Sequence, residues 1–312
     1  MKRNKKDFFA IFIKGCMMGA ADAVPGVSGG TIAFITGIYQ ELIKTLSNLG
    51  LEVLRIAYRQ NIKAAWGYSN ASFLCVLLLG MLCSLILFSN LVLFLLSDYP
   101  QILWGFFFGL IAASSVVLAR SIEGWGKFSG LFFVIGCISS FLLTTITSAV
   151  VDASMINIFL AGMLAICAMI LPGISGSFIL LLLGLYSPIL SAVVNFQGMI
   201  LAVFAAGCAM GLLSFSRLLN WLFFHYKNLV MALLTGFLLG SLNKVWPWKE
   251  TLTTRLNSHG LNVADQQQNI SPFVYEQITG SQSQLIAATL FAVLGCVLVL
   301  ALDKMNGKKD TP

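Results

Sequence analysis

Charged residues are scarce in this sequence of 312 residues: Asp, Glu, Lys and Arg make up 10% of it, against about 25% in a typical soluble domain. Hydrophobic residues make up 58%. So few charges cannot cover the surface of a soluble fold, whereas apolar runs of about 20 residues can cross a bilayer as helices. The composition therefore excludes a soluble protein and predicts an all-α polytopic membrane protein.

The residues of metal and disulfide chemistry are also few. The two histidines, His225 and His259, are too few for a histidine-based metal site. The seven cysteines are odd in number, lie in apolar segments and never form a C-x-x-C pair, so we interpret them as small buried hydrophobic residues. No metal or other cofactor is expected, apart from a coupling proton or monovalent cation.

Basic residues exceed acidic ones by 19 to 12, which gives a net charge of +7, but they form a block only at residues 2–6. Such a bias is typical of the cytoplasmic face of a membrane protein. We therefore expect no nucleic-acid partner.

One motif occurs twice, and repeats often define the architecture of a chain. Residues 23–39 read AVPGVSGGTIAFITGIY, and a second copy begins at residue 172. Each copy places a Pro/Gly/Ser break between two apolar segments. The aligned pairs are Pro25 with Pro172, Gly26 with Gly173, Ser28 with Ser175, Gly29 with Gly176, Ile32 with Ile179, Gly37 with Gly184, Tyr39 with Tyr186 and, upstream, Gly15 with Gly162.

Apolar runs long enough to cross a membrane alternate with two interrupted elements, at about 8–46 and 154–194. In the first element, each half is too short to span a bilayer, and residues 28–46 are predicted to resume as one helix. An amphipathic stretch at 47–70 and a polar loop at 247–283 separate these parts. The full-length runs lie at about 71–97, 101–119, 128–150, 197–222, 229–246 and 284–302.

The positive charges orient these segments. The basic N-terminus is predicted to be cytoplasmic. Arg55, Arg59 and Lys63 are then cytoplasmic only if the first interrupted element returns to the side from which it enters. The same argument makes the second element a hairpin that enters from the opposite side, with both termini cytoplasmic. Lys249 and Arg255, in the external loop, are the exceptions.

These assignments predict inverted-topology repeats with about six full transmembrane helices and two re-entrant hairpins. A second echo, Gly-Phe-x-x-Gly at 105–109 and 236–240, supports the repeat. The predicted units are a first repeat at 1–120, a linking span at 121–153, a second repeat at 154–246, the external polar loop at 247–283, and a last span with a basic cytoplasmic tail at 284–312.

The paired breaks predict an anion site. In inverted-repeat transporters, half-helices start near the bilayer midplane and point their N-termini at anionic substrates. Ser28 and Ser175 stand at the predicted N-cap positions, and glycines allow close approach of a ligand to the backbone amides. The alternative is a pair of tight turns with capping serines. The candidate substrate-binding residues are Asp22, Pro25, Gly26, Ser28, Gly29, Gly30, Thr31, Pro172, Gly173, Ser175, Gly176 and Ser177.

Four charged residues near these segments have two interpretations each. Asp22 is a carboxylate at membrane depth, which favours a functional role such as carrying a coupling proton or cation. Alternatively, it pairs with Lys14 or caps the half-helix. Lys14 contacts the anion or extends to the cytoplasmic surface. Arg120 and Arg217 are topological anchors or attract a phosphate headgroup.

Residues 19–31, followed by Gly37-Ile38-Tyr39, closely resemble the signature of the bacterial polyprenyl-phosphate (undecaprenyl-phosphate) transporter family, formerly a membrane family of unknown function. The copy at Pro172 and the segment 236–241 also fit it. The resemblance implies return of undecaprenyl phosphate from the outer to the cytoplasmic leaflet of the bacterial inner membrane, for synthesis of peptidoglycan and other envelope polymers. The implied partners are that lipid carrier and membrane lipids. No feature specifies an oligomeric state.

Two rival functions can be compared with this resemblance. Undecaprenyl-pyrophosphate phosphatases are similar in their repeats and carry Pro-Gly-x-Ser-Arg-Ser, but Gly29 and Gly176 stand where that arginine belongs. The paired glutamates of that family also have no match near the first motif. Without a charge clamp and a base, pyrophosphate cleavage is disfavoured, and we predict a transporter rather than an enzyme. An inorganic anion channel or exchanger remains open: a closed aqueous pore favours it, and a laterally open site favours a lipid.

Overall fold

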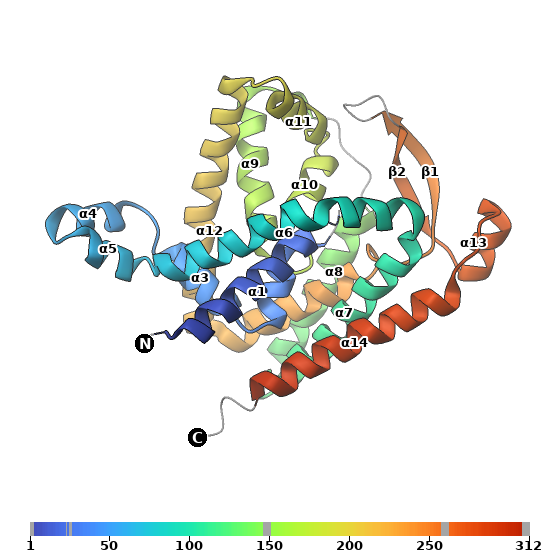
Figure 1. Cartoon of the computed structure of the whole chain (residues 1–312), viewed down its shortest axis with the longest axis horizontal. Coiled ribbons are helices and arrows are strands. Elements are labelled where there is room, and N and C mark those ends of the chain that lie inside the picture. The colour runs from blue at the N-terminus through green and yellow to red at the C-terminus, as the bar shows by residue number, and fades with distance from the viewer. Residues whose placement is uncertain (1–2, 23, 25–26, 146–150, 257–261, 308–312) are drawn as a thin grey trace.

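The computed structural model describes residues 3–22, 24, 27–145, 151–256 and 262–307, and these are mostly helical (Figure 1). The first half contains α1 (Lys5–Asp22), α2 (Gly29–Ile35), α3 (Tyr39–Ser47), α4 (Leu51–Arg59), α5 (Ile62–Tyr68), α6 (Ala71–Asp98) and α7 (Pro100–Arg120). The second half contains α8 (Lys127–Thr145), α9 (Met155–Ile170), α10 (Gly176–Leu182), α11 (Tyr186–Val194), α12 (Gly198–Ser241), β1 (Lys249–Leu256), β2 (Asn262–Asn269), α13 (Pro272–Thr279) and α14 (Leu285–Gly307).

Five of the described helices are long and apolar enough to cross a membrane: α6, α7, α8, α12 and α14. Helix α12 has 44 residues and loses helical backbone geometry at Tyr226, so its two legs correspond to the predicted spans at 197–222 and 229–246. The prediction of an all-α polytopic membrane protein is confirmed. Residues 146–150, at the end of the predicted span 128–150, lie outside the described residues.

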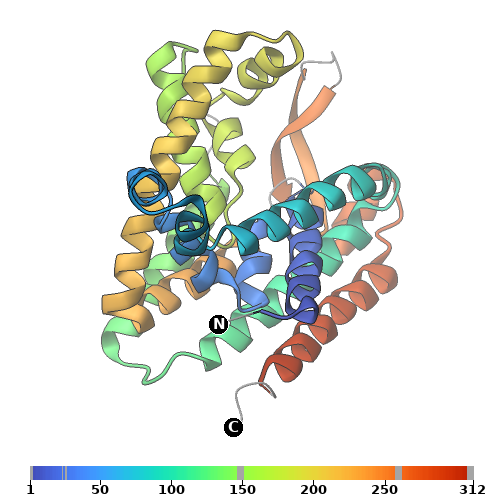
Figure 2. The same ribbon diagram turned by 60° about the vertical axis from the view of Figure 1, so that its left-hand side comes forward.

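Helix packing follows the same plan in both halves of the chain. Helix α1 packs on α6, and α9 packs on the first leg of α12; α7 packs on α14, and α8 packs on the second leg of α12 (Figures 1 and 2). Small residues allow this close approach in the absence of a hydrophobic driving force between helices in lipid. A side chain at Gly15 would collide with the Leu77 carbonyl, and one at the aligned Gly162 with the Phe204 carbonyl.

The segment after each Pro/Gly/Ser break is itself divided into two short helices. Gly37 and Gly184 have φ angles of 73° and 70°, which favour glycine, and they separate α2 from α3 and α10 from α11. Helices α10 and α11 are bent by 116° relative to each other. The prediction of one continuous helix over 28–46 was therefore wrong, because the aligned glycines end the first short helix in each copy.

Within the predicted polar loop at 247–283, the described residues form two antiparallel strands, β1 and β2, followed by α13. Two tryptophans at its start bond to residues later in the segment: Trp246 donates to the Ile270 carbonyl at 2.9 Å, and Trp248 donates to the Ser283 carbonyl at 2.8 Å. The rings of Trp246 and Phe108, on α7, are 5.6 Å apart. The start of the segment therefore packs against α7.

The amphipathic stretch predicted at 47–70 contains α4 and α5, which project from the rest of the molecule (Figure 1). Their apolar side chains are exposed to the surroundings: Leu51 is 81% exposed and Tyr58 is 93% exposed. Apolar and basic residues on one short helical pair are typical of an element lying in the membrane interface.

Candidate functional site

The two repeated breaks lie in direct contact, although about half the chain separates them in sequence. The Ser28 hydroxyl donates to the Met169 carbonyl at 3.1 Å. The Gly173 amide donates to the Thr31 hydroxyl at 2.9 Å. Ser28 and Thr31 are buried, at 1% and 0% exposure. Polar groups from both motifs therefore form one buried cluster within an otherwise apolar protein.

The start of α2 is capped by two side chains. Ser28 has extended backbone geometry, and its hydroxyl accepts from the Gly30 amide at 3.1 Å, as an N-cap serine does. The Asp22 Oδ1 atom accepts from the Gly29 amide at 2.6 Å. Asp22 Oδ2 is buried and has no hydrogen-bond partner in the described part of the chain. Asp22 thus caps the half-helix and places an anion where the sequence predicts the phosphate.

The start of α10 differs from this arrangement. Ser175 occupies the N-cap position, but its hydroxyl lies 2.8 Å from that of Ser177 and does not cap the helix. Gly173 has a φ angle of 86° and lies close to the Ser241 hydroxyl and the Phe237 carbonyl on α12. The breaks are therefore related by sequence but not equivalent in hydrogen bonding.

Some predicted site residues lie beside the cluster, and others do not. Pro172 and Gly176 are buried at the second break. Pro25 and Gly26 lie outside the described residues. Lys14 donates to the Thr36 carbonyl at 2.7 Å, at the opposite end of α2 from Ser28.

The two candidate arginines have other surroundings. Arg217 donates to the Leu49 carbonyl at 3.1 Å, just beyond the end of α3. Arg120 is exposed as the last residue of α7. Neither arginine contacts the two breaks through a hydrogen bond in the described part of the chain, and their roles stay predictions.

Two lysines near the second break are absent from the sequence-based set of candidates. The Lys244 ammonium lies 4.5 Å from the centre of the Phe178 ring, one residue beyond Ser177. The Lys249 ammonium lies 4.6 Å from the centre of the Trp104 ring on α7. Burial, together with the charge of Lys244, lowers the pKa of Lys249 to about 7.

The sequence contained a signal for each lysine. Lys244 lies inside the predicted span 229–246, where a charge is costly. Lys249 is a positive charge in a loop that the positive-inside rule otherwise places outside the membrane. Both lysines are thus positive charges at positions where a membrane protein usually has none.

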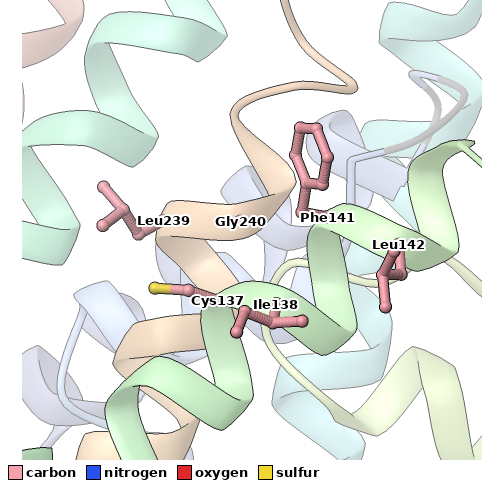
Figure 3. A pocket seen from close by; sticks show the side chains of 6 residues that line it. All are labelled: Cys137, Ile138, Phe141, Leu142, Leu239 and Gly240. Carbon is pink, nitrogen blue, oxygen red and sulfur yellow. The ribbon is translucent and has the colours of Figure 1, made fainter.

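An apolar groove of about 310 Å³ runs between α8 and the second leg of α12 (Figure 3). It is open to the surroundings and ends one residue before Ser241, which contacts the second break. It is lined by Cys137, Ile138, Phe141, Leu142, Leu239 and Gly240. In the described part of the chain, no three His, Cys, Asp or Glu side chains are grouped closely enough to hold a metal ion.

The fold and the buried cluster define a class: a polytopic helical membrane protein with two repeated helix breaks meeting inside it. A family model described as "VCA0040-like: Undecaprenyl phosphate translocase-like" matches residues 18–263. The chain belongs to this family.

Two curated relatives agree with that assignment. A polyprenyl-phosphate transporter of Vibrio cholerae is 43% identical over 308 residues, which cover 99% of this chain and 100% of the relative. A polyprenyl-phosphate transporter of Staphylococcus aureus is 34% identical over 253 residues, covering 75% and 85% respectively. No solved structure matches. The predictions of this family and of a transporter rather than an enzyme are confirmed.

Proposed function

We propose that this protein returns undecaprenyl phosphate from the outer to the cytoplasmic leaflet of the bacterial inner membrane, and that the two helix breaks receive the phosphate. The observation that carries the proposal is the contact between the breaks through Ser28 and Thr31. Hydroxyl and amide donors gathered in an apolar interior suit an oxyanion. The names of the family and of both relatives supply the substrate class.

The groove in Figure 3 supports a lipid over an inorganic anion. Its lining is apolar, and it lies on two helices that are long and apolar enough to cross a membrane, with Ile138, Phe141 and Leu142 exposed. An isoprenoid tail can lie along it while the phosphate approaches Ser241 and Gly173. An inorganic anion gains nothing from such a surface, so the channel or exchanger is the weaker candidate.

Asp22 supplies a mechanism for ion coupling within this proposal. Its carboxylate and an incoming phosphate compete for the Gly29 amide. Protonation of Asp22 removes its negative charge and weakens its bond to that amide, because charged acceptors bind more strongly than neutral ones. Proton binding at Asp22 then favours phosphate binding, and phosphate release favours the return of the carboxylate.

The first test uses purified protein in liposomes that carry undecaprenyl phosphate or undecaprenyl pyrophosphate. We expect leaflet exchange of the monophosphate without phosphate release from the pyrophosphate. The control is protein-free liposomes, and a purified pyrophosphatase shows that release is measurable. Absence of exchange, with and without a proton gradient, contradicts the proposal, as does release of phosphate.

The site is tested by Ser28→Leu and Ser175→Leu. Each leucine places a bulky side chain in the buried cluster and removes a hydroxyl, so we expect exchange to fall at least tenfold while the protein remains in the membrane. Ser97→Leu, at an exposed position near the end of α6, is the matched control. Exchange at the wild-type rate by both break variants would exclude the cluster as the phosphate site.

A further inference from the structure

Lys244 and Lys249 lie close together, and neither forms an ion pair with a carboxylate among the side chains that the structure describes. The Lys249 ammonium donates to the Lys244 carbonyl. Among the side chains that the structure describes, the ion pairs are Arg3–Glu41 and Arg55–Glu52, so neither lysine is neutralised by a described carboxylate. Partly buried cations normally pair with an acid, and an uncompensated pair is costly to the fold.

The segment that carries these lysines is held in place. Trp246 and Trp248 lie between the two lysines in sequence. Their indole N–H groups donate to the backbone carbonyls of Ile270 and Ser283. Asn243 donates to the Thr144 hydroxyl on α8 at 2.7 Å. The two charges are therefore fixed near each other and cannot separate freely into solvent.

The aromatic neighbours stabilise cations without neutralising them. Phe178 faces Lys244, and Trp104 faces Lys249. A ring face carries no net negative charge, so an anion is still attracted to each ammonium. Since two fixed positive charges match the two negative charges of a phosphate monoester, this chemistry fits better than that of a carboxylate or a neutral headgroup.

We propose that Lys244 and Lys249 form a binding site for a phosphate monoester beside the second break, which receives the lipid headgroup before it enters the buried cluster. This inference rests on the proposed function for the identity of the lipid. Phe178 directly follows Ser177, and Ser241 follows Gly240 of the apolar groove and has its hydroxyl close to Gly173. A tail in the groove and a phosphate at the lysines are therefore compatible positions of one molecule.

The test is equilibrium binding of radiolabelled undecaprenyl phosphate to the full-length protein in nanodiscs. We expect the double variant Lys244→Gln/Lys249→Gln to bind at least tenfold more weakly, and Lys244→Arg/Lys249→Arg to retain binding. Lys63→Gln, an exposed lysine on α5, is the charge-matched control and should bind as the wild type does. Undecaprenol, which lacks the phosphate, should bind the wild type and the glutamine variant equally.

A second measurement separates binding from folding. Because glutamine removes buried charge, the glutamine variant should unfold at the wild-type temperature or above in the absence of ligand. Wild-type affinity in that variant overturns the site, and so does equal weakening of undecaprenol binding.

Inorganic phosphate distinguishes the source of the ligand. If the wild type binds inorganic phosphate through the two lysines but neither binds nor exchanges undecaprenyl phosphate, the phosphate site stands and the proposed lipid transport fails. If exchange and lipid binding occur but do not depend on the lysines, the proposed function stands and this site fails.

Discussion

Asp22 caps α2 in the structure and has a proposed role in ion coupling, and one pair of substitutions can separate the two. Asn keeps an oxygen that accepts from the Gly29 amide, whereas Ala removes the cap. We expect Asp22→Ala to destabilise the protein by about 1 kcal/mol, the usual value of an N-terminal cap, and Asp22→Asn to fold normally. We also expect exchange by Asp22→Asn to lose its dependence on pH. Thermal unfolding and liposome exchange between pH 5.5 and 8 measure these effects, and a wild-type pH profile in the Asn variant would leave Asp22 a purely structural residue.

Lys249 predicts a second pH effect, on headgroup binding. Its pKa is lowered to about 7, so the ammonium is present below pH 7 and is lost as the pH rises through 7. The charge of Lys244 contributes to this lowering, and the next residue on β1 is Glu250. Helix α13, which contacts β1, carries Glu276, and hydrogen bonds from Ser283 lower the pKa of Glu276, which keeps it ionised. The phosphate is already largely dianionic above pH 6, so it does not cause a fall above pH 7.

We therefore expect the affinity for undecaprenyl phosphate to fall severalfold between pH 6.5 and 8.5, and Lys249→Arg to remove this fall because its guanidinium stays charged. The same binding assay measures both proteins. A decline that persists unchanged in the arginine variant would assign it to another group.

At the scale of the elements, glycines decide how closely the spans approach. A side chain at Gly109 would overlap the Ala292 carbonyl of α14, whereas one at Gly130 on α8 would meet nothing within 4 Å. We expect Gly109→Ala to destabilise the protein by about 1–3 kcal/mol through forced separation of α7 and α14. Gly130→Ala is the matched control and should be neutral or stabilising. Thermal unfolding in detergent compares them, and equal stability of the two variants would contradict this account of the interface.

Each interrupted element is divided a second time, by Gly37 or Gly184, and the sequence pattern did not predict this division. Gly37 and Gly184 were aligned from the sequence, yet a single helix was expected across Gly37. A glycine inside an apolar run is compatible with a continuous helix, since lone glycines are common in membrane helices. Only the observed positive φ angles show that these two end a helix.

At the scale of the whole molecule, the predicted orientation can be tested by cysteine labelling. In a cysteine-free variant, single cysteines at the exposed positions Gln60, Glu123 and Ser281 report on three connections. We expect an impermeant maleimide to label Ser281→Cys on intact cells, and the other two only after permeabilisation. Labelling of Gln60→Cys on intact cells would show that the first interrupted element crosses the membrane and would contradict the re-entrant hairpin.

The sequence by itself determined the membrane class, most of the spans and the repeated motif. These follow from hydrophobicity and residue spacing, which act locally along the chain. The resemblance of residues 19–31 also identified the family before any fold was known. The strands β1 and β2 and the helix α13 were not predictable in this way, because the bonds of Trp246 and Trp248 join backbone groups that are 24 and 35 residues away.

Only the tertiary structure decided which polar groups meet. The bonds from Ser28 to Met169 and from Gly173 to Thr31 join residues from the two halves, and their pairing depends on how α1, α9 and α12 pack. The same packing brought Lys244 beside Phe178 and Lys249 beside Trp104, whereas the bond from the Gly29 amide to Asp22 is local and was one of the alternatives that the sequence offered. Residue type fixes what each group can bind, but its neighbours are set by contacts between segments far apart in the chain, and no local pattern encodes them.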